Sequence, residues 1–80
     1  MRNQPRKHRF AQAIRLDNID MLRLYIFGYH VEGIAREYNL SPSRVYTRLN
    51  KIATELNHRV SIGDMRSEPE KWLNKLEVLK

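Results

Sequence analysis

The chain has 80 residues, no cysteine and a formal net charge of +6, with 30% charged and 41% hydrophobic residues. This length allows one domain with a core only just large enough to offset chain entropy. The lack of cysteine excludes disulfide frameworks and thiolate metal sites, and no apolar run has the length of a membrane span or the pattern of a signal peptide. We therefore expect a small cytoplasmic domain without a membrane partner.

The first residues are polar and strongly basic, with five basic residues and no acid before Leu16. This composition predicts a flexible arm over residues 1–15, in which Arg6, Lys7 and Arg9 are candidate contacts for phosphates. A solvated tail that touches no partner is an equally good interpretation of such a segment. A membrane surface fits less well, because few apolar side chains accompany the charges.

The next segment predicts a helix up to about residue 27, with Asp17 or Asn18 as its cap and Gly28 as its C-terminal break. Residues 10–15 either form a separate turn or extend this helix backwards. The helix is apolar on two sides, with Ile19, Leu22 and Ile26 on one and Met21 and Leu24 on the other. Such a helix is expected to lie sandwiched between two layers.

A second, short helix follows, in which Val31, Ile34, Ala35 and Tyr38 share one face. Asn39 tolerates a left-handed conformation and predicts a tight corner. Ser41 can then cap a third helix, with Pro42 in the first turn, where its missing N–H costs nothing.

The third helix, over residues 41–56, has two contrasting faces. One is an apolar stripe about 60° wide, made of Val45, Leu49, Ile52 and Leu56. The opposite face is rich in hydrogen-bond donors, positively charged and free of carboxylates; it holds Ser43, Thr47, Asn50, Lys51 and Thr54, flanked by Arg44 and Tyr46. Such a face suits a DNA groove.

The run from residue 24 to 56 resembles the helix-turn-helix of LuxR-type regulators and of region four of bacterial sigma factors. The resemblance rests on Gly28, Ile34-Ala35, Leu40-Ser41, Val45, Leu49, Ile52 and Leu56. The LysR-type winged helix is also similar over residues 34–56, but it needs a longer run before the motif and a wing after it, so we rank it second. The resemblance implies a bacterial or phage-encoded regulator of transcription with double-stranded DNA as its partner, and RNA polymerase is a further partner that region four of sigma factors suggests.

The segment after the helix-turn-helix core of residues 16–60 reads as a linker followed by a last amphipathic helix. Gly63-Asp64 is a turn signal that would fit a minimal wing, but few strand formers follow it, so a plain linker is favoured there. The capping-box spacing of residues 67–70 predicts a helix running towards Leu79. Its apolar face consists of Trp72, Leu73, Leu76 and Leu79. This face either packs on the chain's own core or forms the interface of a homodimer, and we expect the interface.

The sequence offers no residues for catalysis. His8, His30 and His58 lie in three different elements, none with a neighbour at metal-ligand spacing. There is also no glycine-rich phosphate loop, no glycine-flanked serine nucleophile and no carboxylate pair on an apolar face. We expect a non-enzymatic protein with no metal and no cofactor.

These patterns together predict an all-α protein, a small helical bundle of three to four helices that contains a helix-turn-helix. The expected function is sequence-specific binding of double-stranded DNA, with the third helix in the major groove. The residues expected to read bases are Ser43, Arg44, Tyr46, Thr47 and Asn50. Those expected to bind phosphates are Arg6, Lys7, Arg9, His30, Ser41, Lys51 and Thr54. The alternative is an adaptor that docks on RNA polymerase or another regulator through a sigma-like helix-turn-helix.

Overall fold

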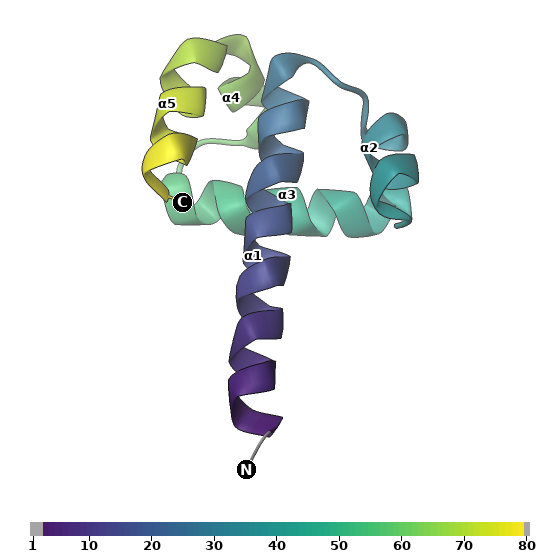
Figure 1. Ribbon diagram of the computed structural model, residues 1–80. Coiled ribbons are helices and arrows are strands. Elements are labelled where there is room, and N and C mark those ends of the chain that lie inside the picture. The colour runs from purple at the N-terminus through teal and green to yellow at the C-terminus, as the bar shows by residue number, and fades with distance from the viewer. Residues whose placement is uncertain (1–2, 80) are drawn as a thin grey trace.

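Five helices make up the part of the chain that the computed structural model describes, which is the backbone of residues 3–79 and the side chains of residues 13–79 (Figure 1). The helices are α1 (Asn3–Phe27), α2 (Val31–Tyr38), α3 (Pro42–Leu56), α4 (Ile62–Ser67) and α5 (Pro69–Leu79), and this part of the chain contains no strand. The all-α bundle expected from the sequence is confirmed, with one helix more than the highest number expected.

Helix α1 begins at Asn3, far earlier than the predicted cap at Asp17 or Asn18, and it includes most of the segment expected to be a flexible arm. The prediction of a helix start at Asp17 or Asn18 is wrong, and residues 10–15 extend the helix backwards. Pro5 is tolerated because it lies in the first turn, whose N–H groups have no partner within a helix. Asn18 is buried inside the bundle rather than placed at a helix end.

The second half of α1 lies at the centre of the fold and contacts each of the other four helices. Figure 1 shows α2 on one side of it and α4 with α5 on the other, while α3 crosses it. Met21 and Leu22, from the two apolar sides of α1, are both fully buried. The predicted sandwich of α1 between layers is therefore confirmed.

The turn between α2 and α3 is built as the sequence predicts. Asn39 has the left-handed φ of 57° and ψ of 47°, and Leu40 N–H donates to Ala35 O at 2.8 Å, which closes the end of α2. Ser41 caps α3, its Oγ accepting from the N–H of Arg44 at 3.3 Å. The result is two helices joined by a short turn, with hydrogen bonds that close α2 and open α3.

The apolar seam of α3 is the largest contribution of this helix to the core. Val45, Leu49 and Ile52 are buried, Leu56 is half-buried, and Ala53 is buried beside them. Each large aliphatic side chain buried in this way contributes about 1.5 to 3 kcal/mol of transfer free energy. The seam thereby holds α3 against α1 and α2 and leaves its opposite side to solvent.

The segment between α3 and the last helix contains α4, so the predictions of a plain linker or a wing are both wrong. Ser61 caps this helix, its Oγ accepting from the N–H of Asp64 at 3.1 Å. Ile62 and Met65, three residues apart, are buried on the same face. Gly63 is exposed within the helix, so the turn signal carried by Gly63-Asp64 is overridden by the cap and by burial.

Helix α5 starts and ends where the sequence predicts, but its apolar face is part of the protein's own core. Trp72 is 2% exposed and Leu76 0% exposed, and Leu73 and Leu79 are partly buried against the same core. Trp72 and Leu76 of the predicted dimer interface therefore lie in the monomer's own core, and a dimer through the partly exposed Leu73 and Leu79 stays a prediction. The predicted capping box is also absent, since Ser67 Oγ donates to Asp64 O instead.

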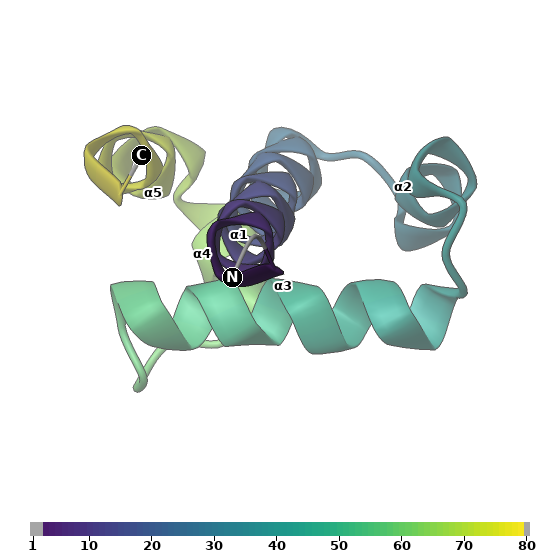
Figure 2. The ribbon, with the colours of Figure 1, turned by 60° about the horizontal axis from the view of Figure 1, so that its bottom comes forward.

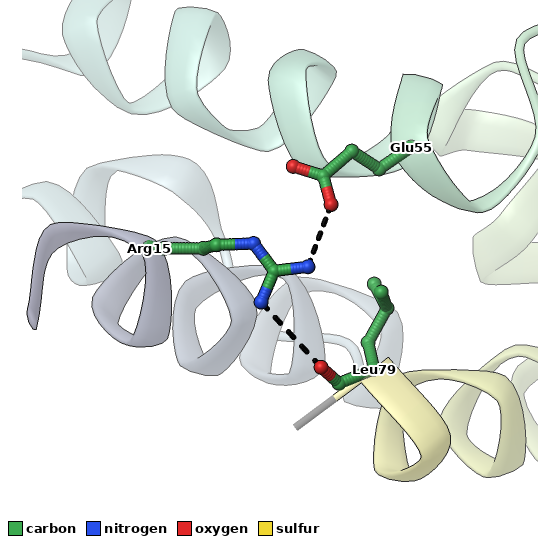
Figure 3. A network of polar contacts seen from close by, with 3 residues as sticks. All are labelled: Arg15, Glu55 and Leu79. Atoms are coloured by element: carbon green, nitrogen blue, oxygen red, sulfur yellow. Dashed lines mark hydrogen bonds and ion pairs between the residues drawn. The ribbon is translucent and has the colours of Figure 1, made fainter. Parts of the chain in front are cut away.

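A network around Arg15 joins three helices (Figure 3). Its guanidinium donates to Glu55 Oε1 in α3 at 2.7 Å and to the carbonyl of Leu79 in α5 at 3.5 Å. Arg23 makes a second link from α1 to α5, with 3.0 Å to Glu77. Exposed pairs of this kind contribute only about 0 to 1 kcal/mol each, so they orient the helix ends while the apolar core stabilises the fold.

Candidate nucleic-acid interface

The side of α3 opposite its buried seam is open to solvent over its whole length. All five residues predicted to read bases, Ser43, Arg44, Tyr46, Thr47 and Asn50, are exposed, and so are the predicted phosphate-binding residues Ser41, Lys51 and Thr54. Figure 2 shows α3 along one edge of the molecule, with α1, α2 and α5 on the other side of it. The structure thus gathers these eight residues on one surface, which we call the α3 face.

The hydroxyl groups of the α3 face are partly engaged with the helix itself. Thr47 Oγ1 donates to Ser43 O at 3.1 Å, and Thr54 Oγ1 donates to Asn50 O at 2.8 Å. Each of these oxygens keeps acceptor capacity and each threonine keeps a methyl group for contact with a ligand.

The charge of the α3 face is positive. Within residues 13–79 the structure shows no ion pair for Arg44 or Lys51, so both cations are available to a partner. Glu55, the one carboxylate of α3, is paired with Arg15 at 2.7 Å and is drawn towards α1. Arg48 is half-buried beside this face, and no ion pair is found for it among the described residues. The face can therefore attract a polyanion.

His30 is exposed and lies at the N-terminal end of α2, but the structure does not bring it beside the base-reading residues. It is the N-cap residue of α2, with no side-chain cap hydrogen bond, and its carbonyl accepts from Ile34 N–H at 3.1 Å. Because α3 follows the other end of this 8-residue helix, which is about 12 Å long, His30 does not adjoin the start of α3. Any phosphate contact of His30 is therefore separate from the α3 face.

Gly33 lies in the interior of α2 next to a shallow hollow lined by Phe27, Gly28, Tyr29, His30, Glu32, Gly33 and Arg36. A Cβ added at Gly33 would meet no atom within 4 Å. The fold therefore has no steric need for glycine at this helical position.

Replacing Gly33 by alanine is expected to raise the free energy of unfolding by about 0.5 to 1 kcal/mol, because alanine loses less conformational entropy in a helix. Urea denaturation followed by circular dichroism measures this change. A destabilised variant would contradict the open surroundings of Gly33. Loss of affinity for duplex DNA in the stabilised variant would show that the missing Cβ serves a close contact with phosphate.

The arm residues Arg6, Lys7 and Arg9 belong to the first turns of α1, and their side chains lie outside the described part of the structure. Figure 1 shows this half of α1 projecting from the bundle, and Figure 2 shows it on the side of α3 that carries the other helices. Its backbone therefore does not run along the α3 face, and contact between the arm and DNA stays a prediction.

Two arginines, Arg66 and Arg59, were not singled out from the sequence. Arg66 stacks on Tyr25 at 4.4 Å from the ring centroid and donates to Tyr29 O at 3.0 Å, which fixes the connection from α1 to α2. Arg59 is exposed in the connection from α3 to α4. The signal that could have found Arg59 is the absence of acids between Glu55 and Asp64.

Tyr38, at the end of α2, is the one described residue whose pKa is clearly shifted. Burial raises the pKa of its hydroxyl above the ordinary 10.0, and the negative charges of Asp20, Asp17 and Glu37 raise it further. Its phenol is therefore neutral at physiological pH. The stability that this shift contributes is lost only as the pH rises above 10.0, the ordinary pKa of tyrosine.

The described residues contain no group of three or more histidine and acidic side chains that could hold a metal ion. None of the helices over residues 3–79 is long and apolar enough to cross a membrane.

The fold therefore contains two helices, α2 and α3, joined by a tight turn, and the exposed face of α3 is polar and positive. Comparison of the chain with protein families, curated proteins and solved structures finds no match.

Proposed function

We propose that this protein is a sequence-specific double-stranded DNA-binding regulator of transcription, which places α3 in a major groove. The proposal rests on the α3 face, which is exposed, polar and positive, while the other side of the same helix is buried in the core. With 15 residues, α3 is about 22 Å long, and a helix of ordinary diameter fits the major groove, which is about 12 Å wide.

The roles within the α3 face follow from the chemistry of each side chain. Arg44 can donate two hydrogen bonds to a guanine edge, and Asn50 can pair with adenine. Ser43, Tyr46 and Thr47 add hydrogen bonds and apolar contact. Phosphates are assigned to Ser41, Lys51 and Thr54, together with His30 and the arm residues Arg6, Lys7 and Arg9.

The assembly on DNA that we propose differs from the one expected from the sequence. Trp72 and Leu76 of α5 are buried in the monomer, so these two residues do not join two copies. We therefore propose that a single copy binds a site of a few base pairs through one recognition helix, and an inverted repeat bound by a dimer is the alternative.

A second candidate function, an adaptor that docks on RNA polymerase or another regulator, is favoured by a different surface. Phe27 is 64% exposed and Tyr29 58% exposed. Phe27 also borders a shallow, mainly apolar groove formed with Ile26, Pro69 and Leu73 and edged by the charged residues Glu68, Glu70 and Lys71. Exposed aromatic side chains beside an apolar groove are typical of protein-binding sites. This surface is separate from the α3 face, so variants of each surface distinguish the two functions.

Selection of bound sequences from a library of random duplex DNA, at moderate salt, tests the proposed function. We expect a short enriched motif that the wild-type protein binds well above the random background. Duplexes bound without any enrichment would contradict sequence-specific binding, and no binding at all would favour the adaptor.

A further inference from the structure

The connection between α3 and α4, residues 57–61, reaches past α3 on the side that carries the α3 face. In Figure 2 it drops below the C-terminal end of α3, away from α1. A ligand that covers the α3 face would therefore meet this connection at one end of the helix.

The connection is held in one shape by hydrogen bonds at both of its ends. Asn57 N–H donates to Ala53 O at 2.9 Å, and Val60 N–H donates to Asn57 O at 3.2 Å. The side chain of Asn57 accepts from the N–H of Arg59 at 2.9 Å, which closes a local turn. Val60 packs against the hydrophobic core. These contacts hold the backbone at Arg59 in place before any partner binds.

The charge at the tip of this turn is positive. His58 and Arg59 are both exposed. No acid occurs in the sequence between Glu55 and Asp64, and Glu55 is engaged with Arg15. Across residues 13–79 the structure shows no ion pair for the guanidinium of Arg59.

We infer that Arg59 contacts a backbone phosphate at the edge of the groove that α3 enters, an inference that rests on the proposed function. A helix in the major groove has phosphates along both walls, and guanidinium groups bind phosphate oxygens well. Because the connection extends beyond the α3 face, it holds the C-terminal end of α3 away from the groove floor. The N-terminal half, with Arg44 and Thr47, then enters deepest, and Thr54 stays at the level of the phosphates.

The test compares wild type with R59A, R59K and the control K75A in binding a duplex of the selected sequence and a duplex of random sequence, each over a series of salt concentrations. Arg59 is exposed in a connection, and Lys75 is exposed on α5, so circular dichroism is expected to show an unchanged helical content in all three variants. For R59A we expect the slope of log K against log salt to fall by about 0.9, which at 0.15 M salt is a loss of about fivefold in affinity.

The loss in R59A is expected to be equal for the two duplexes, since a phosphate contact carries no sequence information, and R59K is expected to recover most of it. K75A is expected to keep the wild-type slope. A wild-type slope in R59A, while wild type binds duplex DNA, would overturn the role of Arg59 and leave the proposed function standing. Failure of wild type to bind either duplex would overturn both.

Discussion

Replacing Trp72 by alanine is expected to lower the free energy of unfolding by about 3 to 5 kcal/mol, a large fraction of the total for a domain of this size. Trp72 is 2% exposed and belongs to the hydrophobic core, as Leu76 does, so its loss leaves a cavity in the core beside α5. Urea denaturation followed by far-ultraviolet circular dichroism measures the change.

The matched control on the same helix is V78A. Val78 is 87% exposed, so its truncation is expected to change stability by less than about 0.5 kcal/mol. Sedimentation over a concentration series completes the test, because it shows whether wild type and W72A are monomers or dimers. A wild-type dimer that becomes a monomer in W72A with little loss of stability would restore the dimer interface on α5.

Replacing Arg44 by alanine is expected to weaken binding to the preferred DNA sequence by about 1 to 3 kcal/mol and to relax the preference at one or two base positions. The reason is that Arg44 is exposed in the first turn of α3 with no ion pair among the described residues, so its guanidinium is available to a guanine edge. T47A is expected to change the preference at a neighbouring position. Fluorescence anisotropy with the preferred duplex and single-base variants measures both effects.

Lys51 provides the contrast within the same face. Because it is assigned to a phosphate, K51A is expected to weaken the binding of all sequences alike and to reduce the salt slope by about 0.9. K75A, on α5, is expected to bind as wild type does. If R44A, T47A and K51A remain folded and keep both affinity and preference, then α3 is not the helix that reads DNA.

The sequence was most informative where short-range signals decide the structure. The left-handed Asn39 and the Ser41 cap are local choices of the backbone, and both were predicted. The seam of Val45, Leu49 and Ile52 was also predicted, because one face of a helix with such spacing can only be buried as a unit.

The errors arose where the sequence leaves two solutions open. Asp17 is a good cap in isolation, yet the helix formers before it let α1 start at Asn3. Residues 62–67 are too short for periodicity to distinguish a linker from α4, and burial of Ile62 and Met65 decides it.

The sequence also leaves two solutions open for contacts between distant parts of the chain. The apolar face around Trp72 indicated that something must cover it, but not whether the cover is the same chain or a second copy. The prediction of the α3 face used periodicity alone and placed its residues together on the surface. The place of the α2 N-terminus relative to that face, and the reach of the connection between α3 and α4 beyond it, depend on how the helices pack, which no local pattern contains.

The central claim is that α3 enters DNA, and the most direct test is an NMR titration of the uniformly ¹⁵N-labelled protein with a duplex of the selected sequence. The account predicts that the largest changes in amide chemical shift fall on residues 41–54 and on the connection near Arg59, while the buried Leu76 and the exposed Val78 in α5 change little. Changes that cluster instead around Phe27 and Tyr29, or no change at saturating duplex, would contradict it.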